Sequence, residues 1–278
     1  MSKRQIQRTN LSIILVLLGL LAVLTIFGCG KKDSEVVVID PSKYQDWQKY
    51  TYGHFVFMVS PHSQYAGDKA TLAKNFERFE REICAILEMP IPEDKITMYV
   101  YAIGVEDREL TGRQTPFSDD STIHWGAKYP YGYELTKFLL RKRGFEPGRF
   151  QVINEGIPFL LDFSGINYHD KTNRRVNSGT YINLEDLGDS QKFDSLDFVA
   201  RRAESASLCG FIMYNYGVDR LFMLGESSVD WRRSIETIFQ MPLEDFEQTW
   251  HIFARENAND PDGTMDNDPV QDLKVIRK

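Results

Sequence analysis

Two short stretches decide how this chain folds: Tyr133-Glu134-Leu135-Thr136-Lys137 and, 17 residues after the first ends, Asn154-Glu155-Gly156. Apolar residues recur at helical spacing around both stretches. This periodicity predicts one helix over Pro130–Arg143 and a second over Phe150–Phe163. A pair of helices that each carry a glutamate is therefore the centre from which the rest of the chain is interpreted.

Before these helices the sequence is rich in strand signals, and after them it is helical. Alternating aromatic, polar and β-branched residues predict three strands, at Tyr50–Val59, Ile96–Tyr101 and Ser121–Trp125. Helical periodicity predicts further helices at Asp68–Leu87, Ala203–Tyr216, Val218–Leu224, Trp231–Phe239 and Leu243–Arg255. A long loop over Gly104–Asp120 and an aperiodic polar insert over Gly165–Asp189 complete the prediction. Strands first and helices later indicate an α+β fold, with a small mixed β-sheet and a helical C-terminal lobe.

The N-terminal residues have the pattern that is typical of a secretion signal. Lys3, Arg4 and Arg8 precede an apolar run over Leu11–Phe27, as in a signal peptide. The following Ile26-Phe27-Gly28-Cys29 resembles the bacterial lipoprotein lipobox. This resemblance implies cleavage before Cys29 and acylation of that residue, which would anchor the protein in a lipid bilayer. An uncleaved membrane anchor is the alternative, because the apolar run is close to the length that spans a bilayer.

These features predict four segments: a signal peptide at 1–28, a polar tether at 29–48, one domain at 49–256 and a disordered acidic tail at 257–278. The domain divides into a sheet-containing part, about 49–126, and a helical part, about 127–256. The expected location is the cell envelope, outside the cytoplasm. Gly30 after the cysteine fits the outer membrane, if the organism has one.

Composition excludes several classes of function. Loss of residues 1–28 removes three basic residues and lowers the formal charge from −7 to −10, so nothing supports nucleic-acid binding. There is no Gly-rich phosphate loop and no Gly-x-Ser-x-Gly elbow. Cys84 and Cys209 lie among apolar residues of predicted helices and are expected to be buried thiols, with a disulfide as the alternative. The basic pairs Arg174-Arg175, Arg201-Arg202 and Arg232-Arg233 are expected on solvated faces.

The order of the predicted elements resembles the peptidase MA-like (gluzincin) superfamily, to which thermolysin and aminopeptidase catalytic domains belong. In that family a His-Glu-x-x-His helix is followed by an Asn-Glu-Gly helix that supplies the third zinc ligand. Three further stretches resemble family elements: Ser121–Gly126 the edge strand, Ala203–Ser207 the helix after the site, and Pro242–Trp250 the closing helix. Together these cover about residues 50–256.

The resemblance implies a role for each residue of the degenerate motif. Glu134 matches the general base, and Glu155 matches the third zinc ligand. Tyr133 and Lys137 stand at the two histidine positions. A phenol with a pKa of about 10 is a poor zinc ligand at neutral pH, and a protonated lysine repels the cation. We therefore expect no metal cofactor, with Lys137 close to Glu155 and within reach of Glu134.

Two alternatives remain open at this stage. The first stretch can be an ordinary amphipathic helix with a solvated Glu134–Lys137 pair. A rebuilt metal site can use His124, Glu134 and Glu155, with zinc as its cofactor. The chain has five histidines, and none pairs with another at helical or strand spacing: His54, His62, His124, His169 and His251.

Two functions follow from this interpretation. The first is a lipid-anchored pseudo-metallopeptidase that binds or scaffolds an unidentified protein, peptide or glycan. The alternative is an active metal-dependent peptidase or other hydrolase that uses the rebuilt site.

Overall fold

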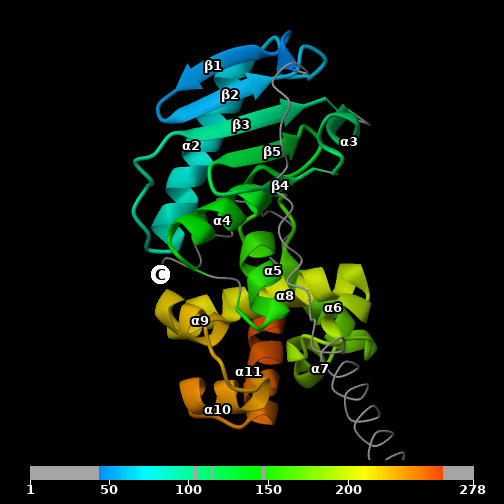
Figure 1. Cartoon of the computed structure of the whole chain (residues 1–278). Helices are drawn as coiled ribbons and strands as arrows, with labels where there is room; N and C mark the ends of the chain where they lie inside the picture. Colours follow the sequence, from blue (N-terminus) through cyan, green and yellow to red (C-terminus); the bar gives the residue numbers. More distant parts are fainter. Residues whose placement is uncertain (1–43, 103–105, 114, 146–147, 259–278) are drawn as a thin grey trace, which may run out of the picture. The chain divides into compact units, whose positions relative to one another are not determined.

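The computed structural model describes residues 44–102, 106–113, 115–145 and 148–258, all of which belong to a unit spanning residues 41–278. In this part of the chain a five-stranded sheet comes first in sequence and most of the helices follow it (Figure 1). The predicted α+β class, with a small mixed sheet and a helical C-terminal lobe, is confirmed.

The sheet has the strand order β1-β2-β3-β5-β4. Parallel pairing joins β2 to β3 and β3 to β5, whereas β1 and β4 are antiparallel to their neighbours. The strands are β1 (Gln48–Tyr52), β2 (Phe55–Val59), β3 (Ile96–Tyr101), β4 (Phe117–Ser118) and β5 (Thr122–Gly126).

Two expectations about the strands are wrong. The single strand predicted over Tyr50–Val59 is the hairpin of β1 and β2, and Gly53 at its turn adopts φ = +57°, a conformation that glycine tolerates. The strand predicted as the sheet edge is β5, which lies between β3 and β4. The edge strand is β4, within the segment expected to be a loop. Two residues are too few to show the alternation that predicts a strand.

Helix α2 (Lys69–Ile86) covers one face of the sheet (Figure 1). The Asp68 side chain caps its N-terminus by accepting a hydrogen bond from the Thr71 backbone N–H at 3.2 Å. Its buried stripe includes Phe76, whose ring packs against those of Phe55 and Phe57 on β2. The alternating burial of β2 and the helical periodicity of α2 thus form one apolar core.

The remaining helices lie mostly after β5. Helix α8 is the central one, because α5, α6, α9 and α11 all contact it. The helices are α3 (Glu106–Thr111), α4 (Tyr131–Lys142), α5 (Gln151–Leu160), α6 (Tyr168–Ser178), α7 (Leu184–Gly188), α8 (Phe198–Tyr216), α9 (Val218–Gly225), α10 (Trp231–Phe239) and α11 (Leu243–Glu256), with a short 3₁₀ turn at Phe193–Ser195.

The polar insert predicted over Gly165–Asp189 contains the helices α6 and α7, which the sequence interpretation did not predict. Helix α6 buries only Tyr168 and Thr172, and this narrow stripe gives almost no hydrophobic periodicity. The sequence features that could have predicted these helices are their N-caps. The Asn167 and Asn183 side chains accept hydrogen bonds from the first turns of α6 and α7. These two helices are thus defined by their ends more than by their buried faces.

The domain extends slightly beyond both predicted boundaries. Tyr44 is 6% exposed and its ring packs against Trp47 and Tyr99, so the tether predicted over 29–48 ends before Tyr44. Ala258 is 2% exposed, so the first residues of the tail predicted over 257–278 belong to the domain. The predicted signal peptide at 1–28, Cys29 and the rest of the predicted tail lie outside the described residues.

The two cysteines of the domain are free and buried, Cys84 on α2 and Cys209 on α8, as predicted. Burial raises the pKa of the Cys84 thiol to about 12 and also raises the pKa of Cys209. Neither group is therefore a thiolate near neutral pH, and both contribute to packing.

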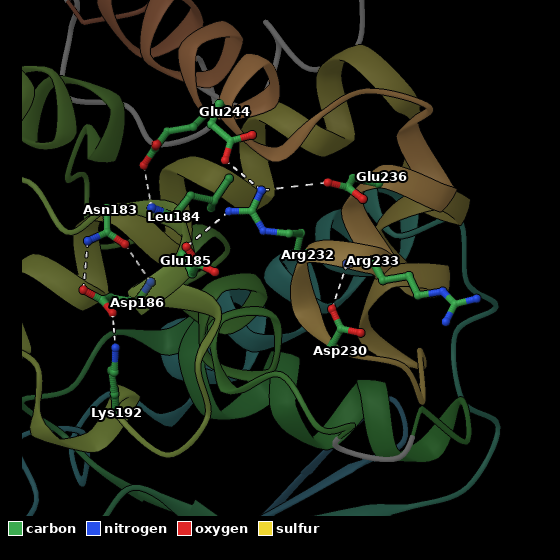
Figure 2. A network of polar contacts seen from close by, with 11 residues as sticks. Asn183, Leu184, Glu185, Asp186, Lys192, Asp230, Arg232, Arg233, Glu236 and Glu244 are labelled. Carbon is green, nitrogen blue, oxygen red and sulfur yellow. Dashed lines mark hydrogen bonds and ion pairs between the residues drawn. The ribbon is translucent and has the colours of Figure 1, made fainter.

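A surface network ties together the last helices of the domain (Figure 2). The Arg232 guanidinium on α10 contacts Glu244 on α11 at 2.7 Å and Glu185 on α7 at 3.2 Å. Because these groups reach solvent, each pair adds little stability, although one arginine contacts both neighbouring helices.

Candidate functional site

Two glycines let helix α5 lie close to its neighbours. A Cβ added to Gly156 would lie 2.6 Å from both the Cys209 sulfur and the Ser205 carbonyl oxygen on α8. On α4, a Cβ added to Gly132 would lie 1.8 Å from the Leu161 carbonyl oxygen, just beyond the end of α5. Any larger residue would push these backbones apart, so Gly132 allows the close approach of α4 to the end of α5, and Gly156 allows the close approach of α5 to α8.

At this separation the side chains of Tyr133 and Lys137 on α4 both reach Glu155 on α5. The Tyr133 hydroxyl donates a short hydrogen bond to Glu155 Oε2. The Lys137 ammonium lies 3.5 Å from Glu155 Oε1 and 5.3 Å from the centre of the Tyr133 ring. The expected proximity of Lys137 to Glu155 is confirmed, and the partnership of Tyr133 with the same carboxylate is a finding that the sequence interpretation missed. Their spacing of four residues on one helix face was the available signal.

Electrostatics keeps the tyrosine protonated. Burial raises the pKa of Tyr133 well above its usual range, and the adjacent negative charge of Glu155 raises it further. The phenol is therefore a hydrogen-bond donor at any physiological pH. It neutralises part of the charge on Glu155 instead of offering an anionic oxygen of its own.

Glu134 has a different partner from the one expected. Its side chain is buried, and Oε1 accepts a short hydrogen bond from the Ser118 hydroxyl on the edge strand β4. The Arg141 guanidinium donates to the same hydroxyl oxygen. Glu134 thus binds α4 to the edge of the sheet, and Lys137 turns to Glu155. The alternative of a solvated Glu134–Lys137 pair is also wrong, because Glu134 is 3% exposed.

The structure does not bring His124 to the glutamates. His124 lies on β5 between Ile123 and Trp125, and the Trp125 ring packs against α2 and stacks on Tyr131 of α4. Because side chains alternate along a strand, His124 points to the opposite face of the sheet from α4.

On that opposite face the His124 ring stacks between Tyr99 and Phe117, with its Nδ1 2.6 Å from the Tyr101 hydroxyl. Burial lowers the pKa of His124 to about 4, so the ring is neutral near pH 7. Across the described ranges of the chain, no three His, Cys, Asp or Glu residues are grouped to hold a metal ion. The rebuilt site of His124, Glu134 and Glu155 is therefore not assembled.

The residues present do not fit the zinc ion that the family resemblance implies. One histidine position holds a cation, Lys137, and the other holds a protonated phenol, Tyr133. Both oxygens of Glu155 face these two groups. A divalent ion here would meet an ammonium group and a single carboxylate, which is not a zinc ligand set.

A cavity of about 470 Å³ opens beside this cluster, and Tyr133 and Glu155 form part of its wall. Much of the rest is aromatic or proline, including Phe159, Phe193 and Phe198. The exposed fraction of Phe198 is 54%, which is high for a phenylalanine. An apolar wall of this size, with a few polar groups at one side, is typical of a site for an organic ligand.

Arginine side chains complete the cavity, which corrects the expectation that Arg201-Arg202 lies on a solvated face. Arg202 lies 2.7 Å from the buried Asp162 carboxylate, and its guanidinium is stacked 4.9 Å from the centre of the Phe159 ring. Arg201 pairs with Asp194 at 3.1 Å. Nothing in the local sequence distinguished these arginines from the solvated pairs elsewhere in the chain.

Arg175 of another basic pair also departs from the expected solvated face. It lies 2.9 Å from Glu204 on α8, whose carboxylate is completely buried. A partly exposed arginine thus joins α6 to a buried glutamate of α8.

Comparisons with known proteins add no assignment: no family model matches the chain, and no curated protein matches its sequence. Within the described residues, no helix is both long enough and apolar enough to cross a membrane. The site is thus defined by its own geometry, as a carboxylate neutralised by a phenol and an ammonium group at the wall of a largely aromatic cavity.

Proposed function

We propose that this protein is a lipid-anchored, extracytoplasmic binding or scaffolding protein, built on a metallopeptidase-like fold in which the zinc-binding positions no longer bind metal. One observation carries the proposal: Tyr133 and Lys137, at the two histidine positions, both contact Glu155, at the third-ligand position. The lysine supplies a fixed positive charge where the family resemblance places a cation.

The physical basis is charge compensation. A carboxylate in a partly buried site needs a cation or hydrogen-bond donors, and Lys137 and Tyr133 supply one of each. The side chains of Lys137 and Glu155 are 31% and 27% exposed, so water screens the pair and its net contribution is about 1 kcal/mol or less. The arrangement is therefore stable without a metal, and it leaves the adjacent cavity open for a ligand.

The cavity supports binding as the retained activity. Its aromatic walls offer apolar area to a side chain or a sugar ring, and Arg201 and Arg202 offer hydrogen-bond donors at one side. A peptide, a segment of a partner protein or a glycan has this mixture of apolar and polar groups. The bilayer contact would come from acylated Cys29, whose replacement by serine should release the protein from membranes into the soluble fraction.

Zinc content tests the proposal. Wild-type protein that has been incubated with excess zinc and then dialysed should carry far less than one zinc per chain, measured by atomic emission. The double variant Tyr133→His with Lys137→His restores the family's ligand set and should bind zinc. A control with Lys142→His and Arg143→His adds two histidines to the same helix outside the site.

Two results would contradict different parts of the proposal. Stoichiometric zinc in the wild type, together with hydrolysis of a peptide library, would show an active metallopeptidase. A folded double variant that bound no more zinc than the control would contradict the metallopeptidase-like arrangement of α4 and α5.

A further inference from the structure

A second, smaller pocket is lined by both members of the Lys137–Glu155 pair. Its volume is about 100 Å³, which accommodates a group of only a few atoms, since one water occupies about 30 Å³ in the liquid. The polar residues that line it are Lys137 and Arg141 on α4, together with Gln151, Asn154 and Glu155 on α5. Leu140 and Phe145 form its apolar wall. The pocket is therefore small, and charged and polar side chains from two helices line it together with two apolar side chains.

The charges that line this pocket favour an anion. Lys137 and Arg141 are four residues apart, so they project from the same face of α4. Glu155 is the acidic residue of the lining, and the Tyr133 hydroxyl and the Lys137 ammonium both compensate its charge. Two cations and one compensated carboxylate give the lining a net positive charge, and the apolar wall strengthens its effect by lowering the local dielectric constant.

Both cations have donor capacity to spare. A lysine ammonium has three N–H donors, and the Glu155 contact at 3.5 Å is at the outer limit of a hydrogen bond. Arg141 has five donors, and the bonds it makes, to the Ser118 hydroxyl and to the Asp119 carbonyl oxygen at 3.5 Å, use one guanidinium nitrogen. The other donors are available to a group that enters from solvent.

We propose that this pocket binds a small oxyanion, a carboxylate or phosphate group, that belongs to the ligand of the neighbouring aromatic cavity; the proposal rests on the binding function proposed above. Gln151 and Glu155 line both cavities. Tyr133 lines the large cavity and Lys137 the small pocket, and these residues are one helical turn, about 6 Å, apart. A single residue with an aromatic side chain and an adjacent acidic group spans this distance.

The proposal is tested by titrating the folded, ¹⁵N-labelled protein with matched small molecules. Binding is followed by NMR. N-acetylphenylalanine has both groups, and N-acetylphenylalanine amide has the same ring without the charge. The free acid should bind about five- to tenfold more tightly than the amide, as expected for charge-assisted hydrogen bonds in a partly exposed site. Phenyl phosphate and inorganic phosphate test the phosphate group in the same way. Whichever oxyanion binds more tightly, carboxylate or phosphate, is identified as the acidic group of the ligand.

Three single variants locate the site. Lys137→Gln and Arg141→Gln should each reduce the preference for the acid over the amide to about twofold or less, whereas Lys142→Gln, the same charge change on the same helix outside the pocket, should preserve it. Because Lys137 also compensates Glu155, Arg141→Gln provides an independent test if Lys137→Gln unfolds. Equal affinity of acid and amide, or equal losses in all three variants, would overturn the oxyanion pocket. In that case amide binding to the large cavity would leave the proposed binding function intact, and its absence would count against that function as well.

Discussion

The close contact between α5 and α8 provides the sharpest test of how the site is positioned. Replacing Gly156 by alanine adds a Cβ that would lie 2.6 Å from Cys209 Sγ and from the Ser205 carbonyl oxygen. Since non-bonded heavy atoms prefer about 3.5–4.0 Å, α5 must move away from α8 by about 1 Å. Such overpacking costs about 1–3 kcal/mol, and the better helix propensity of alanine offsets up to about 1 kcal/mol of this.

With the middle of both ranges, the expected net loss in the free energy of unfolding is about 1–2 kcal/mol. For a unit of residues 41–278 this corresponds to a fall in Tm of about 2–8 °C, measured by circular dichroism or calorimetry. Gly67→Ala is the matched control, because a Cβ there meets no atom within 4 Å. That variant should leave Tm unchanged or raise it slightly by restricting the unfolded chain. If Gly156→Ala were as stable as Gly67→Ala, the close packing that places Glu155 would be refuted.

Two further predictions concern buried polar groups. Burial raises the pKa of Glu204 to about 7 although Arg175 lies 2.9 Å away, so the folded state binds this proton more tightly than the unfolded state. The contribution of Glu204 to stability must then fall as pH rises from about 4.5 to 7. Glu204→Gln should remove that part of the slope of the unfolding free energy against pH. An unchanged slope in this variant would contradict the raised pKa of Glu204. Tyr133→Phe removes the hydroxyl donor to Glu155 and should destabilise the protein by about 1 kcal/mol in urea unfolding, whereas Tyr214→Phe, at an exposed position, should have no measurable effect. Equal stability of the two tyrosine variants would show that the Tyr133–Glu155 bond contributes nothing.

The sequence predicted the long helices well because their signal is local. Helix α10 (Trp231–Phe239) matches its predicted range, and α4 and α5 lie within theirs. Each buries a broad apolar face, so the spacing of hydrophobic residues reveals the period. Strand β4 and helix α6 have no such stripe. Their stability depends on a neighbouring strand or on the α8 and α11 helices, which no short window of sequence contains.

The contacts of the site were also predicted only in part. From sequence alone, Lys137 at a cation's position and Glu155 on the next helix were expected to meet, and they do. That expectation depended on the resemblance to a family in which these two helices pair, together with the opposite charges of the two side chains. The bond of Glu134 to Ser118 was unpredictable, because it joins α4 to an edge strand that the sequence did not reveal.

The sequence by itself thus predicted the fold class, the main helices and the buried thiols, and the family resemblance predicted the meeting of Lys137 with Glu155. Only the tertiary structure decided that Tyr133 shares that carboxylate, that Arg202 lines a cavity and that His124 faces the other side of the sheet. The reason is physical: hydrophobic periodicity and charge sign are properties of a residue and its near neighbours. The direction of a side chain across an interface depends instead on how closely two backbones approach. Here Gly132 allows α4 to approach the end of α5, and Gly156 allows α5 to approach α8.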